Sequence, residues 1–405
     1  MIILVLNCGS SSIKYQVIDM KSATENRLLA KGQVERIGLT DGILTHKPAD
    51  KEKFELVKSI PDHTTGINLI LSTITDPEHG VIGSLNELGA VGHRVAHGGE
   101  YFPDSAVVDK EVIKKIESCF ELAPLHNPAN MKGIMAIENI LPGVPQVAVF
   151  DTSFHQSMPA KNFLYALPYK YYEQYRVRRY GFHGTSHKFV ARKACELTGV
   201  DYDHSRIITC HIGNGASVTA ILNGKSYDTS MGFTPVDGLI MGTRTGEVDP
   251  GALIYIAGKE EMSLSKLSDM INKQSGMLGL TGISSDMRDI EAAVAKGDER
   301  ARLAHEMYNE RVKKFIGAYT AEMGGVDLIV FTGGVGENGP EFRESVCSGL
   351  EFMGVEFDKE ANTGVRGKDR ILSKPASKVK VAVISTNEEL VIASDTFRLL
   401  KKRSE

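Results

Sequence analysis

Apolar runs joined by small-residue turns recur along this chain and predict strand–turn–strand units. Residues 206–225 read RIITCHIGNGASVTAILNGK. They predict a strand over Ile207–His211, a turn at Gly213–Gly215 and a second strand over Ala216–Leu222, because β-branched residues favour strands and Asn-Gly favours hairpin turns. The turn glycines leave main-chain N–H groups uncovered, and such groups can bind phosphate oxygens. Taken alone, the pattern also fits an ordinary hairpin.

The N-terminus repeats this arrangement. Ile2–Asn7 predicts a strand, Cys8–Ser12 a small-residue turn and Ile13–Asp19 another strand. Two such units, far apart in the chain, indicate a duplicated α/β domain with a phosphate-binding hairpin in each half. A third glycine-rich loop, Thr332–Asn338, is predicted after the apolar run Leu328–Phe331.

Periodic apolar positions and capping residues predict helices between the strands. The predicted helices cover residues 62–74, 109–120, 130–139, 186–197, 264–274 and 298–323. Another helix begins at Ser285 or Asp286, and a closing helix follows the strand Val379–Ile384. Residues 27–60 predict a third strand and an irregular extension. Since no low-complexity linker occurs, we expect the boundary between the two halves near residues 150–152.

Composition and charge indicate a globular two-domain protein and disfavour nucleic-acid-binding, membrane and disulfide-rich proteins. A chain of 405 residues with 42% hydrophobic and 24% charged residues is long enough for two domains with separate cores. A net charge of −4 provides no strong basic field for nucleic acid or anionic membranes. The five scattered cysteines contain no C-x-x-C pair and suit a reducing compartment. No secretory signal or apolar run of about 20 residues is present, so we expect a cytoplasmic protein.

Charged residues stand at strand ends and in glycine-rich loops. Arg94 lies at the end of a short strand within Ala90–Gly99, where α/β sheets bind ligands, and it could equally pair with a carboxylate inside the fold. Asp151 follows the apolar strand Val144–Phe150 and is either a site carboxylate or a helix N-cap. Arg244 is held between glycines, which suits a guanidinium that must reach an anion.

Histidines are concentrated in the middle of the chain. Eight of the 12 lie between His93 and His211, which indicates a polar cleft, although core histidines with satisfied hydrogen bonds are the alternative. His183 and His187 have the i, i+4 spacing of a zinc motif. No Glu follows His183 and Gly184 disfavours a helix through both, so we expect His183 to face a substrate and His187 to cap or pack.

Together these segments resemble the acetate kinase family, within the superfamily of acetate and sugar kinases, heat-shock ATPases and actin. The likeness rests, in order from Asn7 to Leu390, on NCGSSSIK, GHRVAHGG, PLHNP, FDTSFH, GFHGTSH, HIGNGAS, MGTRTGEVDPG, SSDMRD, GGVGEN and TNEEL. It implies two duplicated RNase H-like domains, residues 1–151 and 152–385, with an active-site cleft between them and a closing helix, about 386–403, that packs back on the first. It also implies a homodimer that uses ATP or ADP with Mg²⁺ or Mn²⁺, and no nucleic-acid or membrane partner.

The resemblance implies roles for single residues as well. The catalytic group would comprise Arg94, Asp151, His183 and Arg244. The carboxylate substrate would contact Arg94, Ala96, His126 and Pro235. The nucleotide would contact Lys14, His211, Ile212, Gly213, Asn214, Gly215, Asp286, Met287, Arg288, Gly334, Val335, Gly336, Glu337 and Asn338. The metal would be bound by Asn7 and Glu388.

These residue types suit acyl phosphate chemistry. Acetate is already ionised at neutral pH, so the difficulty lies in bringing two anions together and in stabilising charge on the transferring phosphoryl group. Arginines, a histidine and Mg²⁺ would supply positive charge and hydrogen-bond donors. We expect Asp151 to orient an arginine or a metal-bound water rather than to abstract a proton.

Two residues depart from the expected family pattern. Ala96 stands where we expect Val, and the loss of two methyl groups would deepen the acyl pocket, so a propionate or broader short-chain carboxylate kinase is the alternative. Met287 stands where an aromatic residue is expected, and Met can still pack on a base. An ATPase switch or chaperone would need an added partner-binding segment. A sugar kinase would not need two arginines for a neutral substrate.

Overall fold

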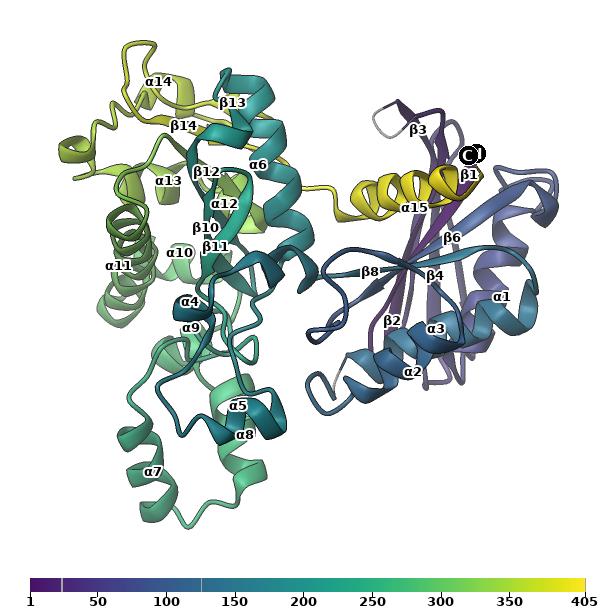
Figure 1. Ribbon diagram of the computed structural model, residues 1–405, viewed down its shortest axis with the longest axis horizontal. Coiled ribbons are helices and arrows are strands. Elements are labelled where there is room, and N and C mark those ends of the chain that lie inside the picture. The colour runs from purple at the N-terminus through teal and green to yellow at the C-terminus, as the bar shows by residue number, and fades with distance from the viewer. Residues whose placement is uncertain (23–24, 125, 405) are drawn as a thin grey trace. The chain divides into compact units, whose positions relative to one another are not determined.

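The computed structural model describes residues 1–22, 25–124 and 126–404 and divides into two compact units (Figure 1). Unit 1 comprises Met1–Phe154 and Asn387–Glu405, and unit 2 comprises His155–Thr386. Leu125, in the PLHNP segment, lies outside the described residues. Among the described helices, none has the length and apolar character needed to cross a membrane.

Unit 1 is built on an eight-stranded sheet with the order β5-β4-β3-β2-β1-β6-β8-β7. Its strands are β1 (Ile2–Cys8), β2 (Ser12–Met20), β3 (Asn26–Glu35), β4 (Gly42–Pro48), β5 (Phe54–Lys58), β6 (Leu88–Val95), β7 (Ala106–Val107) and β8 (Gln146–Phe150). The predicted first hairpin is confirmed. Residues 27–60, however, form three strands rather than one, because β4 and β5 pair as an edge hairpin whose charged residues weaken the apolar signal.

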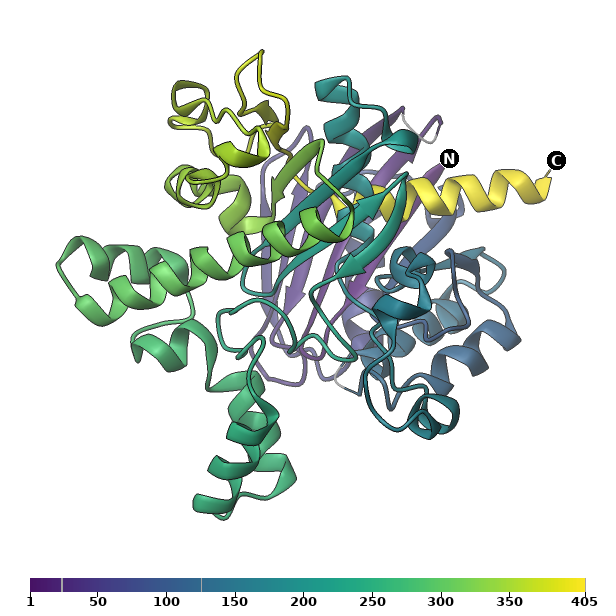
Figure 2. The same ribbon diagram turned by 60° about the vertical axis from the view of Figure 1, so that its left-hand side comes forward.

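Alternation along β1 places apolar side chains on both faces of this sheet. Leu4 packs with helices α1 (His63–Ile74) and α3 (Asn127–Ile140), and Ile3 packs with α15 (Glu388–Ser404). Figure 2 shows α15, the yellow helix, crossing the purple strands of unit 1, and it packs against β1 and β2. The C-terminal helix is therefore part of the core of unit 1. Unit 1 also contains α2 (Lys110–Ser118).

Unit 2 is built on a six-stranded sheet with the order β11-β10-β9-β12-β14-β13. Its strands are β9 (Arg206–Ile212), β10 (Ala216–Leu222), β11 (Lys225–Thr229), β12 (Leu328–Thr332), β13 (Arg370–Ile371) and β14 (Lys380–Val383). β9 pairs antiparallel with β10 and parallel with β12, just as β1 pairs antiparallel with β2 and parallel with β6. The strand order β3-β2-β1-β6-β8 thus recurs as β11-β10-β9-β12-β14, which confirms the predicted duplication.

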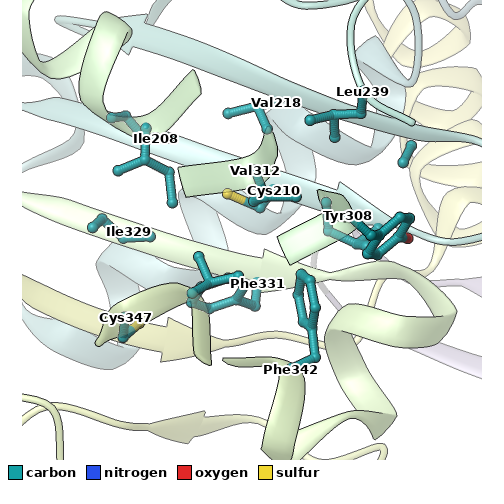
Figure 3. Close-up of a cluster of buried hydrophobic side chains, with 14 of the residues drawn as sticks. Ile208, Cys210, Val218, Leu239, Tyr308, Val312, Ile329, Phe331, Phe342 and Cys347 are labelled. Atoms are coloured by element: carbon teal, nitrogen blue, oxygen red, sulfur yellow. The ribbon is translucent and has the colours of Figure 1, made fainter. Parts of the chain in front are cut away.

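A long helix, α11 (Glu299–Glu322), and the shorter α13 (Pro340–Cys347) bury their apolar sides against the sheet of unit 2 (Figure 3). The rings of Phe331 and Phe342 meet edge to face with centroids 6.0 Å apart. Helix α6 (Gly184–Thr198) also packs against β9. The other helices of unit 2 are α4 (Ala160–Phe163), α5 (Lys170–Tyr175), α7 (Pro250–Lys259), α8 (Leu264–Lys273), α9 (Gly276–Thr281), α10 (Met287–Ala295), α12 (Gly333–Asn338) and α14 (Lys359–Asn362).

The glycine-rich segment after β12 is the short helix α12, so the prediction of a loop was wrong. Gly333 takes a φ of 77°, which glycine adopts without strain and which turns the strand directly into the helix. The Glu337 carboxylate accepts hydrogen bonds from the main-chain N–H groups of Gly333 and Thr386. This tertiary anchoring outweighs the low helix propensity of the glycines.

Two helix starts also differ from the prediction. α3 begins at Asn127 rather than Asn130, because Pro128 occupies the first turn, where proline removes no helical hydrogen bond. α6 begins at Gly184, and His183 precedes it as the N-cap in a left-handed conformation (φ 60°, ψ 28°). His183 is therefore outside the helix that contains His187, as expected from Gly184.

Candidate functional site

Arg94 and Asp151 form an ion pair at the ends of two neighbouring parallel strands, β6 and β8. The Arg94 Nε and Nη2 atoms donate to Asp151 Oδ2 at 2.9 and 2.5 Å, and Nη1 donates to Asn7 Oδ1 at 3.3 Å. The Asp151 charge raises the pKa of Arg94 further. The Arg94 side chain remains 25% exposed. Arg94 thus pairs with a carboxylate inside the fold and still presents a fixed positive charge to solvent.

Glu388, at the start of α15, is the second acidic group near this pair. Burial, aided by the charges of Asp151 and Glu389, raises the pKa of Glu388 to about 7, although Arg94 and Lys14 oppose the shift. A divalent cation would stabilise such a crowded carboxylate. Within the described part of the chain, no three His, Cys, Asp or Glu side chains are placed to hold a metal together.

Asn7 and Glu388 suit Mg²⁺ even without a third protein ligand. A bound Mg²⁺ commonly takes only one or two protein oxygens and completes its shell with water and substrate phosphates. The Asn7 amide and the Glu388 carboxylate offer oxygen donors of the type that this ion prefers. Lys14 pairs with Asn7 across β1 and β2, so this cation is also located in unit 1.

The loop after β6 is held by two asparagines that sequence reasoning missed. The Ala96 N–H donates to Asn130 Oδ1 at 3.0 Å, and Asn130 Nδ2 donates to the Cys8 carbonyl at 2.7 Å. The His97 N–H donates to Asn127 Oδ1 at 3.0 Å. Both asparagines are buried in the first turn of α3, next to its N-cap His126. The sequence signal was the repeated asparagine in Asn-Pro-Ala-Asn.

In unit 2, Gly215 marks the place where two predicted catalytic groups come together. A β-carbon added to Gly215 would stand 3.4 Å from Arg244 Nη1 and 3.5 Å from His183 Nε2. His183 is fixed from its other side, since its Nδ1 lies 2.8 Å from Ser217 Oγ. The hairpin turn between β9 and β10 therefore faces one guanidinium and one imidazole nitrogen.

Arg244 is a partly buried cation whose described partners are neutral. Its Nη1 donates to the Pro235 carbonyl at 3.2 Å and approaches the Met241 sulfur at 3.6 Å. No carboxylate of the described residues lies within ion-pair distance of Arg244. Burial therefore lowers the pKa of Arg244, and an anion beside it would compensate the desolvated charge.

A cavity of about 630 Å³ lies beside the same hairpin in unit 2. It is lined by glycine-rich turns and the starts of α10 and α12. The lining includes eight residues predicted to contact nucleotide: Gly213, Asn214, Asp286, Met287, Arg288, Gly334, Val335 and Asn338. Asp286 caps α10 as expected and pairs with Arg288 at 2.5 Å. Met287 is a buried residue of this wall, and a thioether can pack on a flat ring.

Comparison with known proteins decides the family. The Acetokinase family profile matches residues 2–394. The chain belongs to the acetokinase family. It is 56% identical over 400 residues to the acetate kinase of Caldanaerobacter subterraneus subsp. tengcongensis. The aligned region covers 98% of this chain and 99% of that protein. This acetokinase therefore transfers a phosphoryl group between ATP and acetate.

Solved structures give the same result for the fold. The crystal structure of Porphyromonas gingivalis acetate kinase matches the acetokinase described here with a TM-score of 0.95 at 54% identity, over 98% of this chain and 99% of that one. A propionate kinase from Francisella tularensis matches with a TM-score of 0.89 at 39% identity, over 97% and 98% of the two chains. The predicted duplicated fold is confirmed.

Some predicted nucleotide residues of the acetokinase do not line the cavity. Ile212 and Gly336 are buried in the fold, and the Glu337 carboxylate anchors α12. His211 stacks on His183 with ring centroids 4.2 Å apart. Their contacts with nucleotide stay predictions. The cavity also includes residues that sequence reasoning missed, namely Gly242, Met277, Ser285, Glu291, Tyr308, Gly339 and Arg366.

Proposed function

We propose that this acetokinase forms acetyl phosphate and ADP from ATP and acetate by direct, reversible, in-line transfer. Arg94 binds the acetate carboxylate. Arg244 and His183 donate hydrogen bonds to the transferring phosphoryl group. The observation that carries the proposal is that the Asp151 carboxylate fixes the guanidinium of Arg94, whose Nε and Nη2 atoms both donate to Asp151 Oδ2. A guanidinium held in this way is preorganised to bind a carboxylate at its exposed edge.

The chemistry needs little proton transfer. One acetate oxygen attacks the γ-phosphorus of ATP, the new C–O–P linkage forms, and the bond from γ-phosphorus to the bridging oxygen breaks so that ADP leaves. Negative charge spreads over the three equatorial oxygens in the transition state. Arg244 and His183, which both face Gly215, supply donors for that charge, and each such donor is typically worth about 10²–10³ in rate.

Asp151 serves Arg94 rather than acting as a base. Its Oδ2 atom accepts two hydrogen bonds from Arg94, and acetate carries no proton to remove near neutral pH. A neutral side chain here would leave Arg94 less firmly oriented.

Mg²⁺, or Mn²⁺ in its place, would be held by Glu388 and Asn7 together with phosphate oxygens. When bound, the ion neutralises charge on the β- and γ-phosphates of the nucleotide. The raised pKa of Glu388 supports this proposal, because a carboxylate crowded by Asp151 and Glu389 is stabilised by a cation.

The nucleotide would occupy the cavity of about 630 Å³ in unit 2, with its base against Met287. Turn N–H groups of Gly213–Gly215 would face its phosphates, as the exposed backbone of a glycine turn allows. Lys14 is the remaining cation that the family resemblance assigns to the nucleotide phosphates.

A hydroxamate assay tests the proposed function. It measures acyl phosphate formed from ATP, Mg²⁺ and a series of acids from formate to butyrate. We expect acetate to give the highest kcat/KM, with propionate second because the small Ala96 side chain is buried in the loop beside Arg94. A higher kcat/KM for propionate would favour the alternative of a propionate or broader short-chain carboxylate kinase. Absence of any acyl phosphate would contradict the proposal.

We further propose a cytoplasmic homodimer. All five cysteines are unpaired and buried, which suits a reducing compartment.

The dimer is proposed from exposed apolar side chains on helices α7 and α8, namely Ile254 (72%), Tyr255 (65%) and Leu264 (87%). A second copy of the chain would cover an apolar surface of this kind. Sedimentation of the Ile254→Glu variant tests this proposal, and a dimer of undiminished stability would contradict it.

A further inference from the structure

Four side chains in unit 2 form a buried series of hydrogen bonds that ends at the catalytic candidate His183. Thr209 Oγ1 lies 2.7 Å from His187 Nδ1, and His187 Nε2 lies 2.7 Å from Ser217 Oγ. Ser217 Oγ in turn lies 2.8 Å from His183 Nδ1. Thr209, His187 and Ser217 are fully buried. The series Thr209–His187–Ser217–His183 thus forms a hydrogen-bonded relay.

The local fold explains why the four groups meet. Thr209 on β9 and Ser217 on β10 lie on two paired strands, two residues apart in register. Helix α6 packs against β9 and carries His187 on its inner side. His183 ends the relay because it is the N-cap of the same helix.

Proton positions in the relay are restricted. Burial holds the pKa of His187 well below its usual value, so the ring is neutral and carries a single N–H. If that proton is on Nε2, His187 donates to Ser217, and Thr209 donates to His187 Nδ1. The hydroxyl hydrogen of Ser217 then has two acceptors, His183 Nδ1 at 2.8 Å and the Phe182 carbonyl at 3.3 Å.

The shorter of these two contacts favours donation to His183. A neutral imidazole that accepts at Nδ1 carries its own proton on Nε2. Nε2 is the His183 atom that faces Gly215 beside Arg244. The opposite assignment, with the His187 proton on Nδ1, makes Ser217 donate to His187 and leaves a neutral His183 without an N–H on Nε2.

We propose that Ser217 is a positioning residue that keeps the neutral His183 ring protonated on Nε2, so that His183 donates a hydrogen bond to the transferring phosphoryl group. This inference rests on the proposed role of His183 in the reaction. Among the described residues, the charged and titratable groups around His183 include Arg244 near Gly215, the stacked His211, and His187. His155 in turn contacts His187. A neutral donor avoids placing a second positive charge beside Arg244.

Substitution of Ser217 by Ala tests the proposal through the pH profile of kcat. Without the hydroxyl, neutral His183 populates both tautomers and turns more freely, so we expect kcat to fall about 10- to 100-fold at pH values where the ring is neutral. The loss should shrink at lower pH, where the doubly protonated ring has an N–H on Nε2 whichever tautomer it came from. A loss that is equal at all pH values would overturn the proposal.

A control separates this effect from general damage to the sheet. Thr219→Val removes another buried hydroxyl from β10, one that bonds to Thr229 outside the relay. It should leave the pH profile unchanged. Thr209→Val, which removes the donor to His187 Nδ1, should shift the profile in the same direction as Ser217→Ala. A Thr209→Val profile that matches wild type would count against the relay.

Nitrogen-15 NMR of histidine-labelled, full-length protein tests the tautomer without relying on activity. We expect wild-type His183, assigned by its absence in His183→Ala, to carry its proton on Nε2, and Ser217→Ala to show mixed tautomers. A wild-type proton on Nδ1 would overturn the inference. If His183→Ala keeps full activity while the tautomers behave as expected, the proposed role of His183 fails instead.

Discussion

The carboxylate of Asp151 holds one edge of the Arg94 guanidinium, with Nε and Nη2 both donating to the same oxygen at 2.9 and 2.5 Å. Asp151 is only 2% exposed, and Arg94 is a cationic partner for its buried charge. A buried carboxylate without such a partner would be strongly destabilising. The pair therefore serves both the fold of unit 1 and the orientation of the group that we assign to acetate.

Asp151→Asn should lower kcat while leaving the shape of its pH profile unchanged. The amide keeps the size of the side chain but removes the charge that orients Arg94, and we expect a loss of about 10²-fold, typical of misplaced catalytic groups. Steady-state kinetics across the pH range of stability measures this. If kcat of the wild type falls at low pH and kcat of Asp151→Asn does not, Asp151 would instead act as a base that is lost on protonation.

Gly215→Ala should reduce kcat with little effect on stability. The new β-carbon would stand within 3.5 Å of both Arg244 Nη1 and His183 Nε2, in the space that the phosphoryl oxygens need, and we expect a loss of about 10²-fold or more. The matched control is Gly317→Ala, where no heavy atom other than the neighbouring residues and the backbone of the same helix lies within 4 Å of the new carbon. In the interior of α11 that change should keep activity and add about 0.5–1 kcal/mol of stability.

Acid should destabilise the protein partly through His93. Burial lowers the pKa of His93 from 6.5 to about 4, and its Nε2 lies 2.8 Å from Gln146 Oε1. The unfolded chain binds this proton first, so stability is complete above pH 6.5 and is lost as pH falls toward 4.

Replacing His93 by Gln removes that proton while keeping a hydrogen-bond donor. Urea unfolding at several pH values measures the free energy of unfolding of both proteins. Between pH 6.5 and pH 4 the wild type should lose about 3 kcal/mol relative to the variant. A difference that is constant with pH would mean that His93 titrates normally in the folded state.

Ala96→Val should shift the acid preference toward acetate. The Ala96 side chain is buried and its N–H is fixed by Asn130, so two added methyl groups must occupy space beside Arg94. One methylene in an apolar pocket is worth about 1–3 kcal/mol, so the ratio of kcat/KM for propionate to that for acetate should fall roughly 10-fold or more. An unchanged ratio would place the acyl pocket elsewhere.

Local patterns were sufficient to predict two hairpins, β1–β2 and β9–β10, and most helices. The Asn-Gly turn between β9 and β10 and the Asp286 cap of α10 depend on near neighbours in sequence, and the structure confirms them. The segment Gly333–Asn338 was misread because the anchoring of Glu337 by Thr386 is invisible to local propensity.

The sequence predicted only part of the site, because several of its contacts join segments that are far apart in the chain. Arg94, Asp151 and Arg244 were found from their positions at strand ends and in glycine loops. The contact between Asn130 and Ala96, and that between Ser217 and His183, each join elements about 30 residues apart. Such buried polar contacts follow from packing, not from periodicity.

In the proposed mechanism, Arg94 holds acetate and Arg244 stabilises the transferring phosphoryl group. The most direct measurement follows acetyl phosphate formation and ATP binding in Arg94→Ala and Arg244→Ala. We predict a loss of acetyl phosphate formation of about 10²–10³-fold or more in each variant, with ATP still bound at close to the wild-type Kd. Normal turnover in either variant would remove that arginine from the mechanism.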